Sequence, residues 1–137
     1  MTTSLIPPIE TATDPIQSAD DMGDRWRALM GPLGFGERLL WVGFVGADRR
    51  MIKTLSQVEV GRAPHREMVE NLMIGLSVLL ADIEPGTTVA LLLSRPGNDA
   101  ISVDDRRWGE VLTAGARRIG VPLEPLFRAN DRAIQAL

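Results

Sequence analysis

Apolar residues along the chain follow two different periods, which predict alternating strands and helices. The run Leu39–Val45 is continuously apolar over the length of a strand. After a turn at Gly46–Arg49, the segment Met51–Val60 alternates apolar and polar residues, so the two runs predict an antiparallel hairpin. From Pro64 to Ile83, apolar residues recur every three or four positions, which predicts a long amphipathic helix. Its apolar face is very wide, so we expect it to be buried in the fold or covered by a partner.

The second half of the chain continues the alternation of strands and helices. The expected elements are a buried central strand Thr87–Leu93, an amphipathic helix Val103–Ile119, and two short strands, Val121–Phe127 and Ala133–Leu137. A short helix, Asp20–Met30, is expected ahead of the hairpin. The order α β β α β α β β predicts an α/β protein, a three-layer sandwich with a mixed β-sheet. The two hairpins require antiparallel pairs, which argues against the alternative of a flavodoxin-like doubly wound domain.

The N-terminal segment lacks any hydrophobic period. Residues 1–19 are rich in Thr, Ser and Pro, and we expect a disordered or loosely draped tail before a single domain, 20–137. The segment has neither the basic nor the apolar part of a signal peptide. The longest apolar stretch, Met68–Ala81, is shorter than the ~20 residues that cross a bilayer. These features predict a cytoplasmic protein without a membrane partner.

The composition excludes several classes of function. The 137 residues include no cysteine and one histidine, which excludes disulfides, thiolate metal sites and a cysteine nucleophile. One histidine cannot supply the two imidazoles that most zinc hydrolases use. A net charge of −3 and 4% aromatic residues argue against nucleic-acid binding. Lys53 is the only lysine among 15 basic residues, which we interpret as the codon bias of a GC-rich bacterial genome.

The segment Leu91–Asp105 joins a buried strand to a helix, where α/β proteins often place ligands. Ser102 and Asp105 have the spacing of a capping box, which favours a structural role at the start of the helix. Arg95 has two interpretations. It can form a salt bridge to a nearby aspartate, or it can hold an anion or an acidic partner together with Ser102 and the first amides of the helix. The candidate salt-bridge partners are Asp99, Asp104 and Asp105.

A short series of residues carries a resemblance to a known family. The apolar strand Val89–Leu93 is followed by Pro96, by Ser102 and Asp105 at the start of a helix, and by Arg118–Val121 after it. These positions resemble the JAB/MPN domain of RadC-like proteins, in which a strand leads into a His-x-His-Pro-Ser-Gly loop and a helix begins with Pro-Ser-x-x-Asp. The layout from residue 37 to residue 137 is similar too. The resemblance implies a sandwich of the JAB/MPN, cytidine-deaminase-like type.

The departures from this family concern its zinc site. In active members, two histidines and the aspartate bind zinc, the serine stabilises the oxyanion, and an upstream glutamate, here Glu59, is the general base. The histidine positions hold Leu93 and Arg95, and neither side chain can ligate zinc. The loop is also one residue shorter. The resemblance therefore implies a catalytically silent member without metal or cofactor, whose vestigial site comprises Glu59, Leu93, Arg95, Ser102 and Asp105.

These observations predict a non-catalytic protein-interaction or scaffold module. We expect its partner to be another protein or a second copy, giving a homo-oligomer. One alternative is a regulatory domain that binds a small anion or a nucleotide through Arg95 and Ser102. Another is a metal-independent hydrolase that uses Glu59, Ser102 and Asp105. A serine nucleophile needs an adjacent base, and the single histidine, His65, is distant in sequence and expected at the surface.

Overall fold

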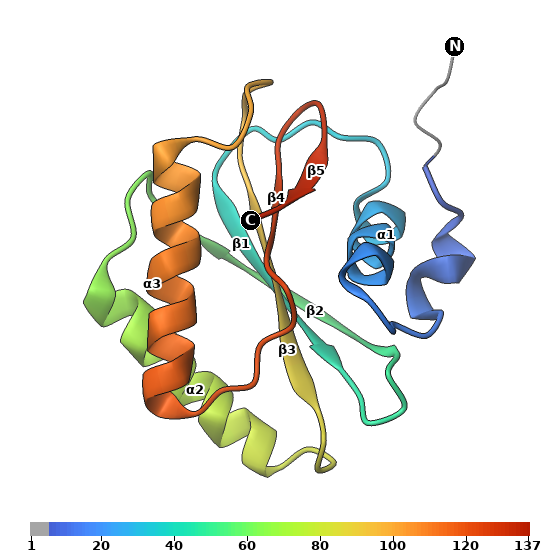
Figure 1. The fold of residues 1–137 in the computed structure, drawn as a ribbon, viewed down its shortest axis with the longest axis vertical. Helices are drawn as coiled ribbons and strands as arrows, with labels where there is room; N and C mark the ends of the chain where they lie inside the picture. Colours follow the sequence, from blue (N-terminus) through green and yellow to red (C-terminus); the bar gives the residue numbers. More distant parts are fainter. Residues whose placement is uncertain (1–5) are drawn as a thin grey trace.

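A five-stranded sheet in the order β2-β1-β3-β4-β5 forms the middle layer of the computed structural model, which describes residues 6–137 (Figure 1). Strand β1 pairs antiparallel with β2 and β3, β3 pairs parallel with β4, and β4 pairs antiparallel with β5. The predicted mixed sheet in an α/β sandwich is therefore confirmed. The elements are η1 (Ile9–Thr13), α1 (Ala19–Met30), β1 (Leu39–Val45), β2 (Met51–Glu59), α2 (Arg66–Ala81), β3 (Thr88–Ser94), α3 (Val103–Ile119), β4 (Phe127–Ala129) and β5 (Ile134–Ala136).

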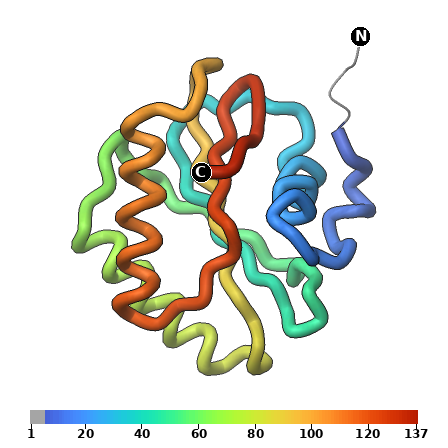
Figure 2. Tube along the Cα trace, in the orientation of Figure 1, coloured from blue at the N-terminus to red at the C-terminus, as the bar shows by residue number. Residues whose placement is uncertain are grey.

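Helices cover both faces of the sheet. Figures 1 and 2 show α2 and α3 on one face and η1 and α1 on the other. Alternate residues of β1 divide between two cores, because successive side chains in a strand point to opposite faces. Leu40 and Val42 pack with α2 and α3, whereas Val45 packs with Trp26 of α1. The chain thus has one apolar core on each side of the sheet.

Helix α3 has the bounds predicted from its period, and its local sequence explains both ends. The Ser102 hydroxyl accepts a hydrogen bond from the Asp105 amide, and the Asp105 carboxylate accepts one from the Ser102 amide, which confirms the predicted capping box. Gly120 ends the helix with φ of 91°, a left-handed conformation that glycine adopts without strain. Helices α3 and α2 approach each other closely at Gly115 of α3, where a Cβ would lie 2.9 Å from Cγ1 of Val69 in α2.

Helix α2 buries only one side of its wide apolar face. Val69 and Met73 are buried on the sheet and α3. On the outer side, Ile74, Val78 and Leu79 are 45%, 63% and 52% exposed. The fold therefore covers most of the predicted apolar face and leaves Ile74, Val78 and Leu79 on the surface. No helix among residues 6–137 is long and apolar enough to cross a membrane.

The predicted tail is wrong for the part of it that the structure describes. Residues 9–13 form the 3-10 helix η1, and Ile16 is only 1% exposed in the core beneath α1. The Ile16 amide donates to the Arg49 carbonyl at 2.7 Å, and Arg49 Nε donates back to the Ile16 carbonyl at 3.0 Å. These contacts join residues far apart in sequence, so a local period could not reveal them. Residues 1–5 of the predicted tail lie outside the described range.

The predicted strand Val121–Phe127 is also wrong. Within it, only Leu123 forms an isolated bridge, to Val89 of β3, and β4 begins at Phe127. Pro122 and Pro125 lack an N–H group, so this stretch cannot form a continuous ladder. The segment instead runs alongside β3 as an extended connection, and the last hairpin is shorter than predicted.

Candidate functional site

The residues singled out in the sequence meet where β3 ends beneath the start of α3. Leu93, at one of the two positions where the resembled family has a histidine, is buried in the core between the sheet and the helices α2 and α3. Arg95 follows β3 directly, and its amide donates to the Ala129 carbonyl of β4 at 3.0 Å. The loop is therefore held against the neighbouring strand, with the Arg95 side chain beneath α3.

Arg95 is enclosed by carboxylates. Its side chain is 4% exposed, and it makes a bidentate pair with Asp105, Nε to Oδ1 at 2.8 Å and Nη2 to Oδ2 at 2.7 Å. Asp105 is fully buried. Asp99 accepts two further hydrogen bonds from the same guanidinium, at 2.9 and 3.2 Å. The predicted salt bridge of Arg95 is confirmed, with Asp99 and Asp105 as its partners.

A second buried arginine, Arg128 of β4, completes this site and was not identified from the sequence. Its Nε lies 3.5 Å from Oδ2 of Asp105, and its Nη2 donates to Oε1 of Gln135 at 2.6 Å. Nε and Nη1 have no hydrogen-bond partner among residues 6–137. Arg128 lies between Phe127 and Ala129 in β4, and no hydrophobic period in the sequence indicated that its side chain is buried. We call Arg95, Asp99, Asp105 and Arg128 the arginine–aspartate cluster.

The cluster keeps Asp105 ionised. Burial raises the pKa of this carboxyl, but hydrogen bonds from the Arg95 guanidinium and the Ser102 amide outweigh burial and hold its pKa below the usual range. The hydrogen bond with Asp105 raises the pKa of Arg95. Burial lowers the pKa of Arg128. A carboxylate that is paired in this way is a weak base, so Asp105 is poorly suited to take a proton from Ser102.

The structure does not bring Glu59 to the cluster. Glu59 of β2 is opposite Leu39 of β1, which in turn is opposite Ser94 of β3. Residues opposite one another share a face of the sheet, and Leu39 lines a hollow under α1. Leu93 and Arg128 lie on the other face, under α3. Glu59 is therefore two strands away, about 10 Å by strand spacing, and on the opposite face.

Ser102 has no free base beside it in the described part of the chain, because the neighbouring Asp105 carboxylate is paired with Arg95. The hydrogen bonds of its side chain and amide join it only to Asp105. His65 is the N-cap residue of α2, is exposed, and makes no side-chain capping bond. Of the five predicted site residues, the structure thus brings Arg95, Ser102 and Asp105 together. Leu93 lies in the adjoining core and Glu59 lies elsewhere.

The donor set at this place does not fit a zinc ion. Among residues 6–137, no three His, Cys, Asp or Glu side chains are grouped to hold a metal. Asp105 is the one carboxylate buried at the site, and two guanidinium groups already surround it. A cation bound there would have to displace an arginine from its carboxylate.

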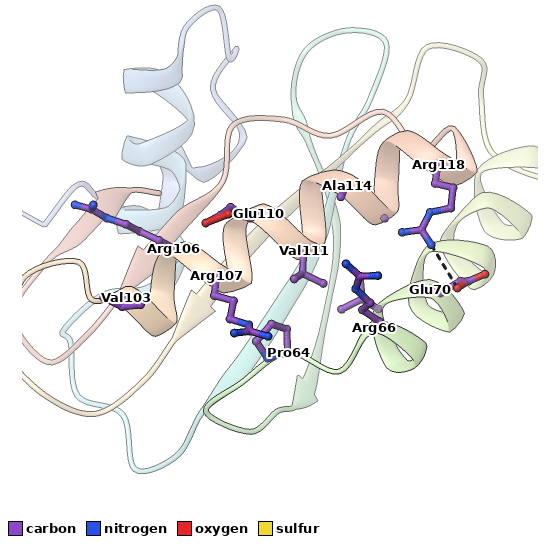
Figure 3. A pocket seen from close by; sticks show the side chains of 12 residues that line it. Pro64, Arg66, Glu70, Val103, Arg106, Arg107, Glu110, Val111, Ala114 and Arg118 are labelled. Atoms are coloured by element: carbon purple, nitrogen blue, oxygen red, sulfur yellow. Dashed lines mark ion pairs between the residues drawn. The ribbon is translucent and has the colours of Figure 1, made fainter.

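A separate surface groove lies between α2 and α3. It encloses about 560 Å³ and is lined by four arginines, two glutamates and several apolar residues. Arg107 extends from α3 toward Pro64, just before α2, and Arg118 extends toward α2 and lies 3.6 Å from Glu70 (Figure 3). The groove needs two helices that are distant in sequence, so inspection of either helix alone could not reveal it. The charged lining residues are Arg66, Arg106, Arg107, Arg118, Glu70 and Glu110.

Comparison with known proteins gives no assignment. No family model matches the chain. A search of curated proteins finds no significant match either. We therefore interpret the arginine–aspartate cluster and the groove between α2 and α3 from their geometry alone.

Proposed function

We propose that this chain is a non-catalytic protein-interaction or scaffold module, as its resemblance to JAB/MPN domains implies. The observation that supports this proposal is the arginine–aspartate cluster. At the carboxyl end of β3, where an α/β sheet commonly presents its reactive groups, Arg95 and Asp105 neutralise each other in the interior. Such a site suits a structural role, because the Asp105 carboxylate and the Arg95 guanidinium are engaged within the chain.

The same geometry disfavours the two alternatives drawn from these residues. The guanidinium of Arg95 donates to Asp99, Asp105 and backbone carbonyls, and with 4% of its side chain exposed it offers no open donor to a soluble anion. A metal-independent hydrolase would need a free base beside Ser102. Asp105 is bound to Arg95, and Glu59 is on the other face of the sheet.

Zinc titration tests the non-catalytic assignment. We expect metal-free protein to show no stoichiometric binding of Zn²⁺ by calorimetry and no rise in its thermal midpoint, because the cluster offers one carboxylate that two arginines already pair. The matched variant is Asp105→Asn, which should behave in the same way toward zinc. Binding of one zinc ion per chain that is lost in Asp105→Asn would contradict the proposal.

A second candidate function is binding of an acidic peptide in the groove between α2 and α3. Four arginines and two glutamates line this groove in a chain whose net charge is −3, so positive charge is concentrated there. Val69, Val103 and Val111 supply apolar contacts along its floor and rim. The combination suits an extended peptide with carboxylates flanking small apolar residues.

Binding of a glutamate-rich peptide is expected to depend on arginines of both helices. Measured by fluorescence anisotropy at low salt, the dissociation constant should rise at least about tenfold in the double variant Arg66→Glu/Arg107→Glu, because two contacts become repulsive. Arg117→Glu/Arg132→Glu is the control, since it makes the same change of charge at two exposed arginines that do not line this groove. Equal weakening by the control and by Arg66→Glu/Arg107→Glu would show that only net charge matters, and would refute a specific groove site.

A further inference from the structure

The outer edge of β2 is unpaired in the described part of the chain. β2 is the first strand in the sheet order, and its residues 52–59 are all exposed. Ile52, Leu55 and Val58 are exposed by 37–38% along this strand. An edge strand of this length offers a row of free backbone donors and acceptors. It also contains no proline, which is one residue that commonly blocks further pairing.

The hydrogen-bond pattern shows which residues of β2 face outward. The Val60 amide donates to the Arg38 carbonyl at 3.1 Å, so that pair is hydrogen-bonded to β1. Antiparallel pairs alternate, so Val58 and Ser56 also direct their backbone groups to β1. The backbone groups of Leu55, Gln57 and Glu59 then point to the open edge.

The two ends of this edge carry opposite charge. Lys53, the only lysine of the chain, lies near the beginning of β2, and Glu59 is its last residue. Glu37 is beside Glu59, and its hydrogen bond with that carboxyl, followed by the like charge, raises the pKa of Glu37. Among residues 6–137, neither Glu59 nor Lys53 forms a salt bridge, so each end of β2 carries a charge without an oppositely charged partner.

We propose that a second copy of this chain adds its β2 antiparallel to β2, so that Lys53 of each copy is opposite Glu59 of the partner subunit. The two sheets then form one continuous sheet of ten strands around a two-fold axis. This inference rests on the proposed function, since it names the partner and the surface of the interaction module. Affinity comes from the main-chain hydrogen bonds of the added strand, and the charges select its register.

The charges favour one register over its neighbours. A two-fold axis perpendicular to the sheet keeps each helical layer on its own side, so only residues that share a face can be opposite one another. Between Leu55 and Met51 the pairing of β2 with β1 shifts by two residues, which keeps Lys53 on the same face as Leu55 and Glu59. With Ser56 on the axis, Lys53 is opposite Glu59 twice. With Leu55 on the axis, Glu59 would be opposite Met51. With Gln57 on the axis, Glu59 would be opposite Leu55. Only the Ser56 register forms two ion pairs.

The same register covers part of the exposed apolar strip of β2. Ile52 is opposite Val60 of the partner subunit, and Val58 is opposite Thr54 of the partner subunit. These residues lie on the face of the sheet that carries α2, because Val58 is opposite Leu40 of the core under α2 and α3. The pairing thus shortens the exposed apolar strip along β2 as well as satisfying its backbone.

Sedimentation velocity over a range of concentrations tests this pairing. We expect a concentration-dependent dimer, and at least about a tenfold weaker one for Lys53→Glu and for Glu59→Lys, because each puts like charges opposite one another twice. An equimolar mixture of the two variants should recover wild-type affinity, since the mixed dimer restores both ion pairs. Arg117→Glu on α3 is the control and should dimerise normally.

A second variant tests the backbone. Gln57→Pro removes an amide that faces outward, so it should abolish the dimer while preserving the pairing with β1, monitored by circular dichroism. A wild-type chain that stays monomeric, or a dimer that neither charge reversal nor Gln57→Pro weakens, would overturn the inference. Neither result bears on zinc binding, so failure of the pairing and failure of the non-catalytic assignment are distinguishable.

Discussion

Replacing Asp105 with asparagine is expected to lower the free energy of unfolding by about 3–5 kcal/mol, the cost of removing one partner from a buried ion pair. Asp105 is fully buried and accepts two hydrogen bonds from Arg95, and Arg128 lies 3.5 Å from it. The amide has nearly the same shape as the carboxylate but no charge. The substitution therefore leaves two buried guanidinium groups with no buried counter-ion, which is the main source of the loss.

Urea unfolding followed by far-ultraviolet circular dichroism measures this loss at a fixed chain concentration. Asp99→Asn is the matched control. Asp99 pairs with the same guanidinium, but its side chain is 57% exposed, so water can replace much of the lost contact and the loss should be clearly smaller. Equal losses of unfolding free energy in the two variants would show that burial does not determine how much Asp105 contributes to stability.

The effect of Asp105→Asn should also depend on pH. The pKa of Asp105 is lowered in the folded state, so its contribution is fully present above the unfolded value of about 3.9 and is lost as pH falls through the lower folded value. The difference in unfolding free energy between wild type and Asp105→Asn should be constant near neutral pH and shrink in acid below that window. A difference that persists unchanged in strong acid would contradict an ionic origin.

Replacing the whole buried set with apolar residues should cost less than breaking it. Buried ion pairs can often be exchanged for well-packed apolar side chains without loss, because the desolvation of the charges offsets their attraction. The triple variant Arg95→Met/Asp105→Leu/Arg128→Met is therefore expected to be more stable than Asp105→Asn alone. This comparison separates the cost of unpaired charge from the value of the cluster itself.

The sequence predicted those elements whose cause is local. The continuous apolar run Leu39–Val45 and the period of Val103–Ile119 gave strand β1 and helix α3 with correct bounds, and Ser102 with Asp105 gave the cap. One error falls where distant segments decide, because Ile16 is buried in the core under α1 and bonds to Arg49. The other has a local cause, since Val121–Phe127 has strand composition but Pro122 and Pro125 lack amide donors.

The candidate site, too, was predictable only where its contacts are local in the sequence. A salt bridge between Arg95 and a nearby aspartate follows from their separation of four and ten residues along one loop and helix start. The contribution of Arg128 required the parallel pairing of β3 with β4, which places it opposite Leu93. Likewise, the sequence could not show that Glu59 is on the other face, since that depends on the register of three strands.

Trp108→Ala is expected to cost about 3–5 kcal/mol of stability, because it removes the largest buried side chain between α3 and the sheet. The indole also fixes the connection between β2 and α2. Its Nε1 donates to the carbonyls of Gly61 at 3.3 Å and Arg62 at 3.0 Å. The alanine variant thus leaves a cavity beneath α3 and releases this connection from the helix.

Comparison with Trp26 separates these two contributions of Trp108. Trp26 is equally buried, in the core under α1, but its Nε1 has no hydrogen-bond partner among residues 6–137. Both Trp→Phe substitutions lose similar volume, but Trp108→Phe alone also loses a hydrogen bond, worth about 0.5–1.5 kcal/mol. Urea unfolding should therefore rank Trp108→Phe as the more destabilised. Faster amide hydrogen exchange around Gly61 should appear in Trp108→Phe and not in Trp26→Phe, and the reverse order of stability would show that the indole hydrogen bonds to this connection contribute nothing.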